Sequence, residues 1–136
     1  MVMKMNRGMK QRKHRAWVEI PGSNKRFFYY IKIGESVPPT LSVISWCEFS
    51  GFEDDKETAI FEGDVCQGSY ICPACYDTEP HILTGEVVYD NDRGMWMFDY
   101  GHGAMPMYSF YENGNTFRII GNVYENPHLL EVNHEP

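Results

Sequence analysis

The sequence has no apolar stretch long enough to cross a membrane. Its longest stretches without charge, such as residues 36–47, contain Ser, Thr and Pro and fall well short of the roughly 20 apolar residues of a membrane helix. The basic residues 1–15 are not followed by the roughly 7–15 apolar residues of a secretory signal. We therefore expect a cytoplasmic protein without a membrane partner.

Catalytic motifs are also missing. The sequence contains no P-loop, no dinucleotide glycine pattern, no G-x-S-x-G and no H-E-x-x-H. His102 lies between two glycines, but no nucleophile motif is near it. We expect no enzyme, and we assign no catalytic or cofactor-binding residue.

Acidic residues cluster in two places without forming a recognisable calcium loop. The first cluster is Glu53, Asp54, Asp55 and Glu57, and the second is Asp90 with Asp92. Neither has the order of oxygen ligands, ending in a bidentate Glu, that a calcium loop needs. The sequence therefore predicts solvated turns at both.

Basic residues are scarce after Lys32. Residues 1–32 hold nine of the twelve Lys and Arg and one acid, Glu19, whereas the remainder holds three basic and eighteen acidic residues. A basic N-terminal region can contact nucleic acid or the acidic surface of a neighbouring copy, or it can be a solvated tail. These three alternatives stay open.

A helical period is almost absent, and short β-branched and aromatic runs alternate with turns. The pattern predicts a flexible basic arm, residues 1–13, and one mainly-β domain, residues 14–136. We expect a β-hairpin of strands 15–20 and 26–33 joined by residues 21–24, and a second hairpin of strands 85–89 and 95–100 with its turn at residues 90–94. Further strands are expected at residues 41–49 and starting at Val65.

The C-terminal third carries two further local signals. Residues 105–111 and 116–124 are expected to pair as the last hairpin, because Asn113 and Gly114 suit a tight turn. Asn126 and Pro127 predict a short C-terminal helical turn, since Pro is tolerated at a first helical position.

Four parts of the sequence, in this order, resemble the YopX-like proteins of phages and prophages. They are residues 15–17 (Arg-Ala-Trp), residues 49–65 with their Glu-Gly-Asp-Val, residues 85–90 (Gly-Glu-Val-Val-Tyr-Asp), and residues 119–130. The last part carries most of the specificity, and the resemblance spans about residues 15–131. Val18, Ser50 and Phe52 depart from the family pattern, and residues 66–75 have no counterpart in it.

The resemblance implies an SH3-like β-barrel with additional strands, and a phage or prophage origin. It brings no reaction and no catalytic residue. Gly51, Gly63 and Gly121 stand where turns, bulges or close backbone approach are expected, and Asp64 can cap a turn. We interpret these shared residues as folding residues.

Two cysteines have the spacing of half a zinc site. Cys72 and Cys75 form a C-x₂-C pair, and Cys66 with His81 is the nearest completion of a tetrahedral site. A redox dithiol is a weaker alternative, because the region lacks the helix N-terminus that lowers a thiol pKa. An ordinary loop without a cofactor is the favoured interpretation.

The aromatic residues 27–30, beside Lys25, Arg26 and Lys32, could stack on nucleic-acid bases. Alternate residues of a strand face opposite sides, so half of these aromatics are expected in the core. Our leading hypothesis is a phage accessory protein that acts through protein contacts, including contacts with its own copies. A nucleic-acid-binding module that uses the basic arm is the alternative.

The zinc hypothesis predicts about one equivalent of metal in protein purified without chelators. The double variant Cys72→Ser, Cys75→Ser should lose that metal and unfold more easily, because metal binding is coupled to folding. Elemental analysis and thermal melting measure both effects. Metal-free wild-type protein would contradict the hypothesis.

Overall fold

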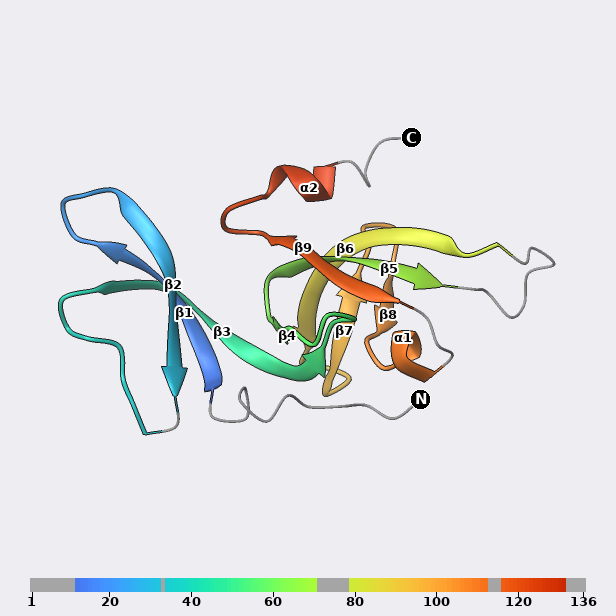
Figure 1. Ribbon diagram of the computed structural model, residues 1–136, viewed down its shortest axis with the longest axis horizontal. Coiled ribbons are helices and arrows are strands. Elements are labelled where there is room, and N and C mark those ends of the chain that lie inside the picture. The colour runs from blue at the N-terminus through green and yellow to red at the C-terminus, as the bar shows by residue number, and fades with distance from the viewer. Residues whose placement is uncertain (1–11, 33, 71–78, 113–115, 132–136) are drawn as a thin grey trace.

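A computed structural model describes residues 12–32, 34–70, 79–112 and 116–131 (Figure 1). The described residues form nine strands in two sheets and two helices of four residues each, so the protein is mainly β. No described helix has the length and apolarity that crossing a membrane requires. The predicted division into a basic arm and one domain stays a prediction.

The first sheet has four strands in the order β2-β1-β3-β4. Their bounds are Arg12–Ile20 for β1, Lys25–Lys32 for β2, Ser42–Glu53 for β3 and Ala59–Phe61 for β4. β1 and β2 form the predicted hairpin, in which Gly22 and Asn24 take positive φ angles of 81° and 60°. β3 continues from this sheet toward the second one (Figure 1).

The second sheet has five strands in the order β8-β7-β6-β5-β9. They are β5 (Asp64–Tyr70), β6 (His81–Asp90), β7 (Met95–Asp99), β8 (Ala104–Pro106) and β9 (Phe117–Asn122). This sheet curls around the main core, and the predicted hairpin around residues 90–94 is confirmed as β6 and β7. Gly68 makes room for Phe110 against β5, because a Cβ there would lie 2.5 Å from the ring of Phe110.

The predicted hairpin between residues 105–111 and 116–124 is wrong. β8 pairs with β7, β9 pairs with β5, and Ser109–Glu112 form the short helix α1. Met107 and Phe110 are both fully buried in the main core. Residues three apart point to opposite faces of a strand but to one face of a helix, so burying both requires a helical turn. Asn113 and Gly114 lie outside the described residues.

The C-terminal helical turn is confirmed as α2, His128–Glu131. The side-chain oxygen of Asn126 accepts the backbone N–H of Asn122, the last residue of β9, at 3.3 Å. Gly121 lies beneath this segment, because a Cβ there would lie 2.6 Å from that oxygen. The described segment up to Glu131 is therefore folded against the second sheet.

The first acidic cluster is only partly solvated, contrary to expectation. Glu53 and Asp54 are buried, whereas Asp55 and Glu57 are exposed. Asp54 Oδ1 accepts the N–H groups of Lys56 and Thr58, and its Oδ2 accepts the N–H of Ile119. One carboxylate therefore shapes the turn and ties it to β9.

A buried ion pair joins the two sheets. Arg15 on β1 donates from Nη2 to Oδ1 of Asp64 on β5 at 2.6 Å, and Asp64 Oδ2 accepts the N–H of Phe61 at 2.8 Å. The guanidinium carbon lies 3.9 Å from the ring centre of Phe28 and 4.9 Å from that of Phe61. The pair is thus enclosed by aromatic rings and backbone, and Asp64 caps a turn as expected.

Tyr124 makes a second connection between the sheets. Its ring stacks on Trp17 at 5.5 Å and meets the edge of Phe28 at 5.7 Å. Its hydroxyl lies 2.9 Å from Ser45 Oγ and 3.4 Å from Cys47 Sγ, both on β3. The segment after β9 therefore holds one face of the four-stranded sheet.

One cross-strand pair joins like charges. Glu86 on β6 lies directly opposite Asp99 on β7. Burial raises the pKa of Glu86, and repulsion from Asp99 and from Glu62 raises it further. Since like charges directly opposite each other destabilise a sheet, the native fold tolerates this arrangement at some cost.

The buried pair predicts strong coupling between Arg15 and Asp64. Arg15→Met or Asp64→Asn alone should lower the free energy of unfolding by about 3–5 kcal/mol, because one charge stays buried without its partner. The double variant should lose much less than the sum, measured by urea unfolding. Arg26→Met, which removes an exposed pair with Glu19, should cost less than about 1 kcal/mol. Additive losses at Arg15 and Asp64 would contradict the coupling.

Glu86→Gln should stabilise the protein at neutral pH. The folded state raises the pKa of Glu86, so it holds the proton more tightly than the unfolded chain, and wild-type stability falls as pH rises through that range. We expect a gain of about 0.2–1 kcal/mol at neutral pH that vanishes below roughly pH 4. Urea unfolding across this range measures it, with Glu131→Gln as the control. A gain that is constant with pH would argue against a charge effect.

Candidate binding cleft

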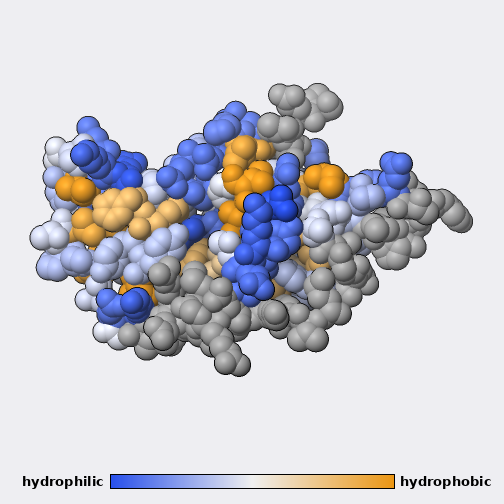
Figure 2. Space-filling model, viewed as in Figure 1, coloured by the Kyte–Doolittle hydropathy of each residue, from blue (hydrophilic) through white to orange (hydrophobic). Residues whose placement is uncertain are grey.

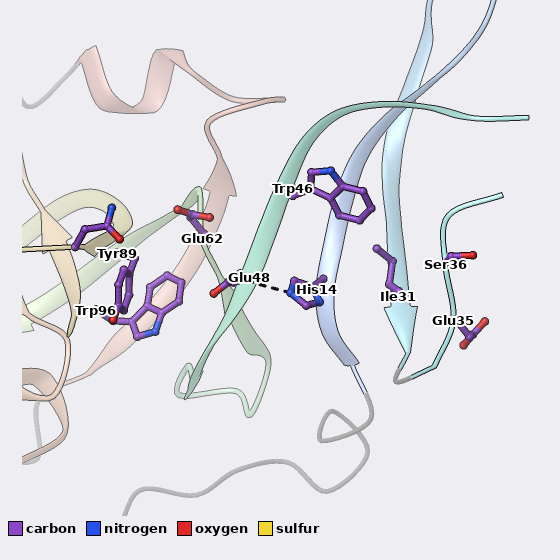
Figure 3. Close-up of a pocket in the computed structure, with 10 residues that line it drawn as sticks. His14, Ile31, Glu35, Ser36, Trp46, Glu48, Glu62, Tyr89 and Trp96 are labelled. Carbon is purple, nitrogen blue, oxygen red and sulfur yellow. Dashed lines mark ion pairs between the residues drawn. The ribbon is translucent and has the colours of Figure 1, made fainter. Parts of the chain in front are cut away.

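A cleft of about 760 Å³ lies between the two sheets (Figure 3). Its described lining comes from β1, β2, β3, β6, β7 and the connections beside them: His14, Ile31, Glu35, Ser36, Trp46, Glu48, Glu62, Tyr89, Asn91 and Trp96. This volume falls in the range of about 300–1,000 Å³ that ligand-binding sites occupy. The cleft is therefore large enough to hold several side chains of a partner.

Aromatic side chains form two walls of the cleft. Trp46 on β3 belongs to the wall that the four-stranded sheet supplies, and it is 55% exposed. Tyr89 and Trp96 form the opposite wall and meet edge to face at 5.2 Å (Figure 3). An exposed Trp that lines the same hollow as a second aromatic pair is typical of protein-binding surfaces.

Half of the polar lining residues of the cleft, Trp and Tyr aside, are acidic. Glu35, Glu48 and Glu62 line the cleft, and none of its described lining residues is Lys or Arg. His14 Nε2 lies 3.9 Å from Glu48 Oε1 (Figure 3). Glu62 also acts on Glu86, which connects the cleft to the like-charge pair on β6 and β7. The cleft therefore suits a cationic group.

The structure separates two of the four candidate zinc ligands. Cys66 is fully buried in the main core, where burial raises the pKa of its thiol well above the usual value, whereas His81 is exposed. Cys66 pairs with Gly85, and His81 pairs with Tyr70 four residues farther along β5, roughly 13 Å away at the usual strand rise. Cys72 and Cys75 lie outside the described residues.

The described residues also offer no other metal site. No group of three or more His, Cys, Asp or Glu side chains suited to a metal occurs among them. Cys47 and Cys66 are buried free thiols. Zinc binding by Cys72 and Cys75 stays a prediction.

Of the four aromatics of the platform predicted on β2, Phe28 and Tyr29 are partly buried and Phe27 and Tyr30 are exposed, Tyr30 by 40%. Phe28 lies between Trp17 and the Arg15 guanidinium, and Tyr30 meets Phe61 edge to face at 5.6 Å. Arg26 pairs with Glu19. Phe27 remains 37% exposed, and apolar surface gathers over this sheet at the left of Figure 2.

Sequence reasoning did not identify the cleft residues as a site. It placed Trp46 in a strand without assigning it to either face, and Tyr89 and Trp96 in a hairpin. The alternation of Ile44, Trp46 and Glu48 along β3 was the available signal, since these three are exposed while Cys47 is buried. Their convergence with β6 and β7 depends on the contact between the sheets.

Comparison with known proteins gives one family. The family model described as YopX protein matches residues 1–131, nearly the whole chain. No curated protein and no solved structure matches the chain significantly. On this match, and in agreement with the four sequence segments, the chain belongs to the YopX family.

Proposed function

We propose that this YopX-family chain is a non-enzymatic accessory protein of a phage or prophage that binds another protein, or a second copy of itself, through the cleft. The observation that carries the proposal is Trp46, which is 55% exposed and lines the same cleft as Tyr89 and Trp96. Burying such a side chain in a partner removes a large apolar area from water. Trp is among the residue types enriched in binding hot spots.

Three finer points accompany the proposal. The curled antiparallel five-stranded sheet around one core supports an SH3-like barrel. The buried thiols of Cys47 and Cys66 support a reducing compartment such as the cytoplasm. Zinc binding by Cys72 and Cys75 is a separate proposal, because the proposed binding of a partner in the cleft requires no metal.

Nucleic-acid binding is the second candidate. It is supported by the basic residues 1–13 and by Lys25 and Lys32, which are exposed on β2. The acidic cleft opposes it, since carboxylates repel phosphates. The two candidates therefore predict different surfaces and different responses to nuclease.

The test is retention of partners by tagged protein from phage-infected or prophage-induced cells, with and without nuclease. We expect the wild type to retain the same proteins after nuclease. Trp46→Ala should reduce this retention by about tenfold, the effect of losing roughly 1.4 kcal/mol of binding energy. Ile82→Ala, at an exposed apolar residue outside the cleft, is the matched control and should change nothing. Sedimentation of both variants tests self-association.

Two results would contradict the cleft as the binding surface. Loss of every retained protein on nuclease treatment would favour nucleic acid. Equal retention by wild type and Trp46→Ala would place the binding surface elsewhere. Because Trp46 is exposed, its removal should leave the circular dichroism spectrum unchanged, so a folding defect can be recognised.

A further inference from the structure

The edge of β3 beside the cleft has open backbone groups. On the side away from β1, β3 pairs with β4 only between Phe49 and Glu53. Glu62 then donates its N–H to Glu48 O at 2.9 Å, and the chain turns away at Gly63, whose φ is 90°. Beyond Glu48, no strand of the described part of the chain pairs with β3 on this side.

The hydrogen bond from the Glu62 N–H to Glu48 O shows toward which side of β3 the backbone N–H and C=O of Trp46 point. Backbone groups alternate between the two sides of a strand, so residues two apart point the same way. Since Glu48 O points toward β4, the N–H and C=O of Trp46 point toward the same, open side. Trp17 pairs with Ser45 and Val18 with Val43, so Ile44 forms a bulge in β3. This bulge limits the open stretch to a few residues.

The open edge borders the acidic and aromatic cleft. A strand added beside Trp46 would continue the line of β4, on the side of β3 where Tyr89 and Trp96 lie (Figure 3). Its side chains would lie within the lining that contains Glu48 and Glu62. A Lys or Arg there gains ion pairs with these carboxylates and a cation–π contact with an aromatic ring.

We propose that the cleft binds an extended, Arg- or Lys-containing segment of a partner protein, which adds as a short strand to β3 beside Trp46. The inference rests on the proposed function and names the chemistry of the partner. It also gives a role to the like-charge pair, since a cation near Glu62 would offset the field that Glu62 and Asp99 exert on Glu86. The backbone bonds set the register, and the cation supplies the selectivity.

A symmetric contact between two copies of this edge fits less well. An isologous contact places the same residues of both copies against each other. Glu48 and Glu62 would then face their own counterparts, and like charges brought together oppose association. The basic residues 1–13 of a second copy have the required chemistry and are one instance of the proposed partner.

Three labelled peptides test the chemistry directly. The first is a nonapeptide that alternates Arg with Thr, the second replaces each Arg of it by Glu, and the third is the thirteen-residue peptide of residues 1–13 of this chain. We expect the Arg peptide and the peptide of residues 1–13 to bind, with affinities that fall as salt rises, and the Glu peptide to bind at least about tenfold more weakly. Fluorescence anisotropy measures all three.

Variants of the full chain locate the binding. Trp46→Ala and Glu48→Gln should each weaken the Arg peptide by about tenfold, an effect in the range of a cation–π contact and a charge-assisted hydrogen bond. Glu131→Gln, which removes an exposed acid on α2, is the matched control and should bind as the wild type does. Equal weakening by Glu131→Gln would reduce the effect to net charge and overturn the proposal.

Backbone methylation tests strand addition. Two Arg peptides carry N-methyl groups on alternate amides, in one or the other register. Methylation should abolish binding only in the peptide whose methylated amides would face β3. Binding of the unmethylated peptide should protect the Trp46 amide from hydrogen exchange. If both methylated peptides bind equally, strand addition is wrong while the cleft function stands. If no peptide binds although cellular partners still require Trp46, the basic-partner inference is wrong and the proposed function survives.

Discussion

The ion pair between Arg15 and Asp64 is the contact on which the relation of the two sheets depends. Taking both charges out of water carries a large desolvation penalty, and their attraction offsets it only with good geometry and further hydrogen bonds. Here Asp64 also accepts the N–H of Phe61, and two rings cover the guanidinium. A slipped register would leave both charges unpaired, so the pair selects one arrangement of the sheets.

The segments that relate this chain to its family meet at this junction. Arg15 and Trp17 come from the first segment, Gly63 and Asp64 from the second, and Tyr124 from the last. A Cβ at Gly63 would lie 3.0 Å from the Tyr124 ring, so the glycine makes room for the tyrosine. The shared residues therefore specify how the sheets join.

Local chemistry made the hairpins predictable, whereas contacts between the sheets did not. The turns at residues 21–24 and 90–94 follow from their own residues, and both predictions are confirmed. The 105–111 strand failed because Met107 and Phe110 must both enter a core that other strands build. Trp46 and Tyr89 belong to different sheets, so no local pattern could place them across one cleft. The burial of Asp54 likewise depends on β9.

The geometry of the cleft follows from the same junction. One wall belongs to the four-stranded sheet and the other to the five-stranded sheet, so the separation of the walls depends on contacts made by Arg15 and Tyr124 on the opposite face. A ligand that contacts both walls binds only the arrangement in which the sheets are correctly joined. By linkage, such a ligand stabilises the junction, and the gain grows with the logarithm of its concentration once that exceeds the dissociation constant. The pair of Arg15 and Asp64 is buried on one face of the four-stranded sheet. The acidic and aromatic groups of the cleft stay exposed on the other face, where a partner can contact them.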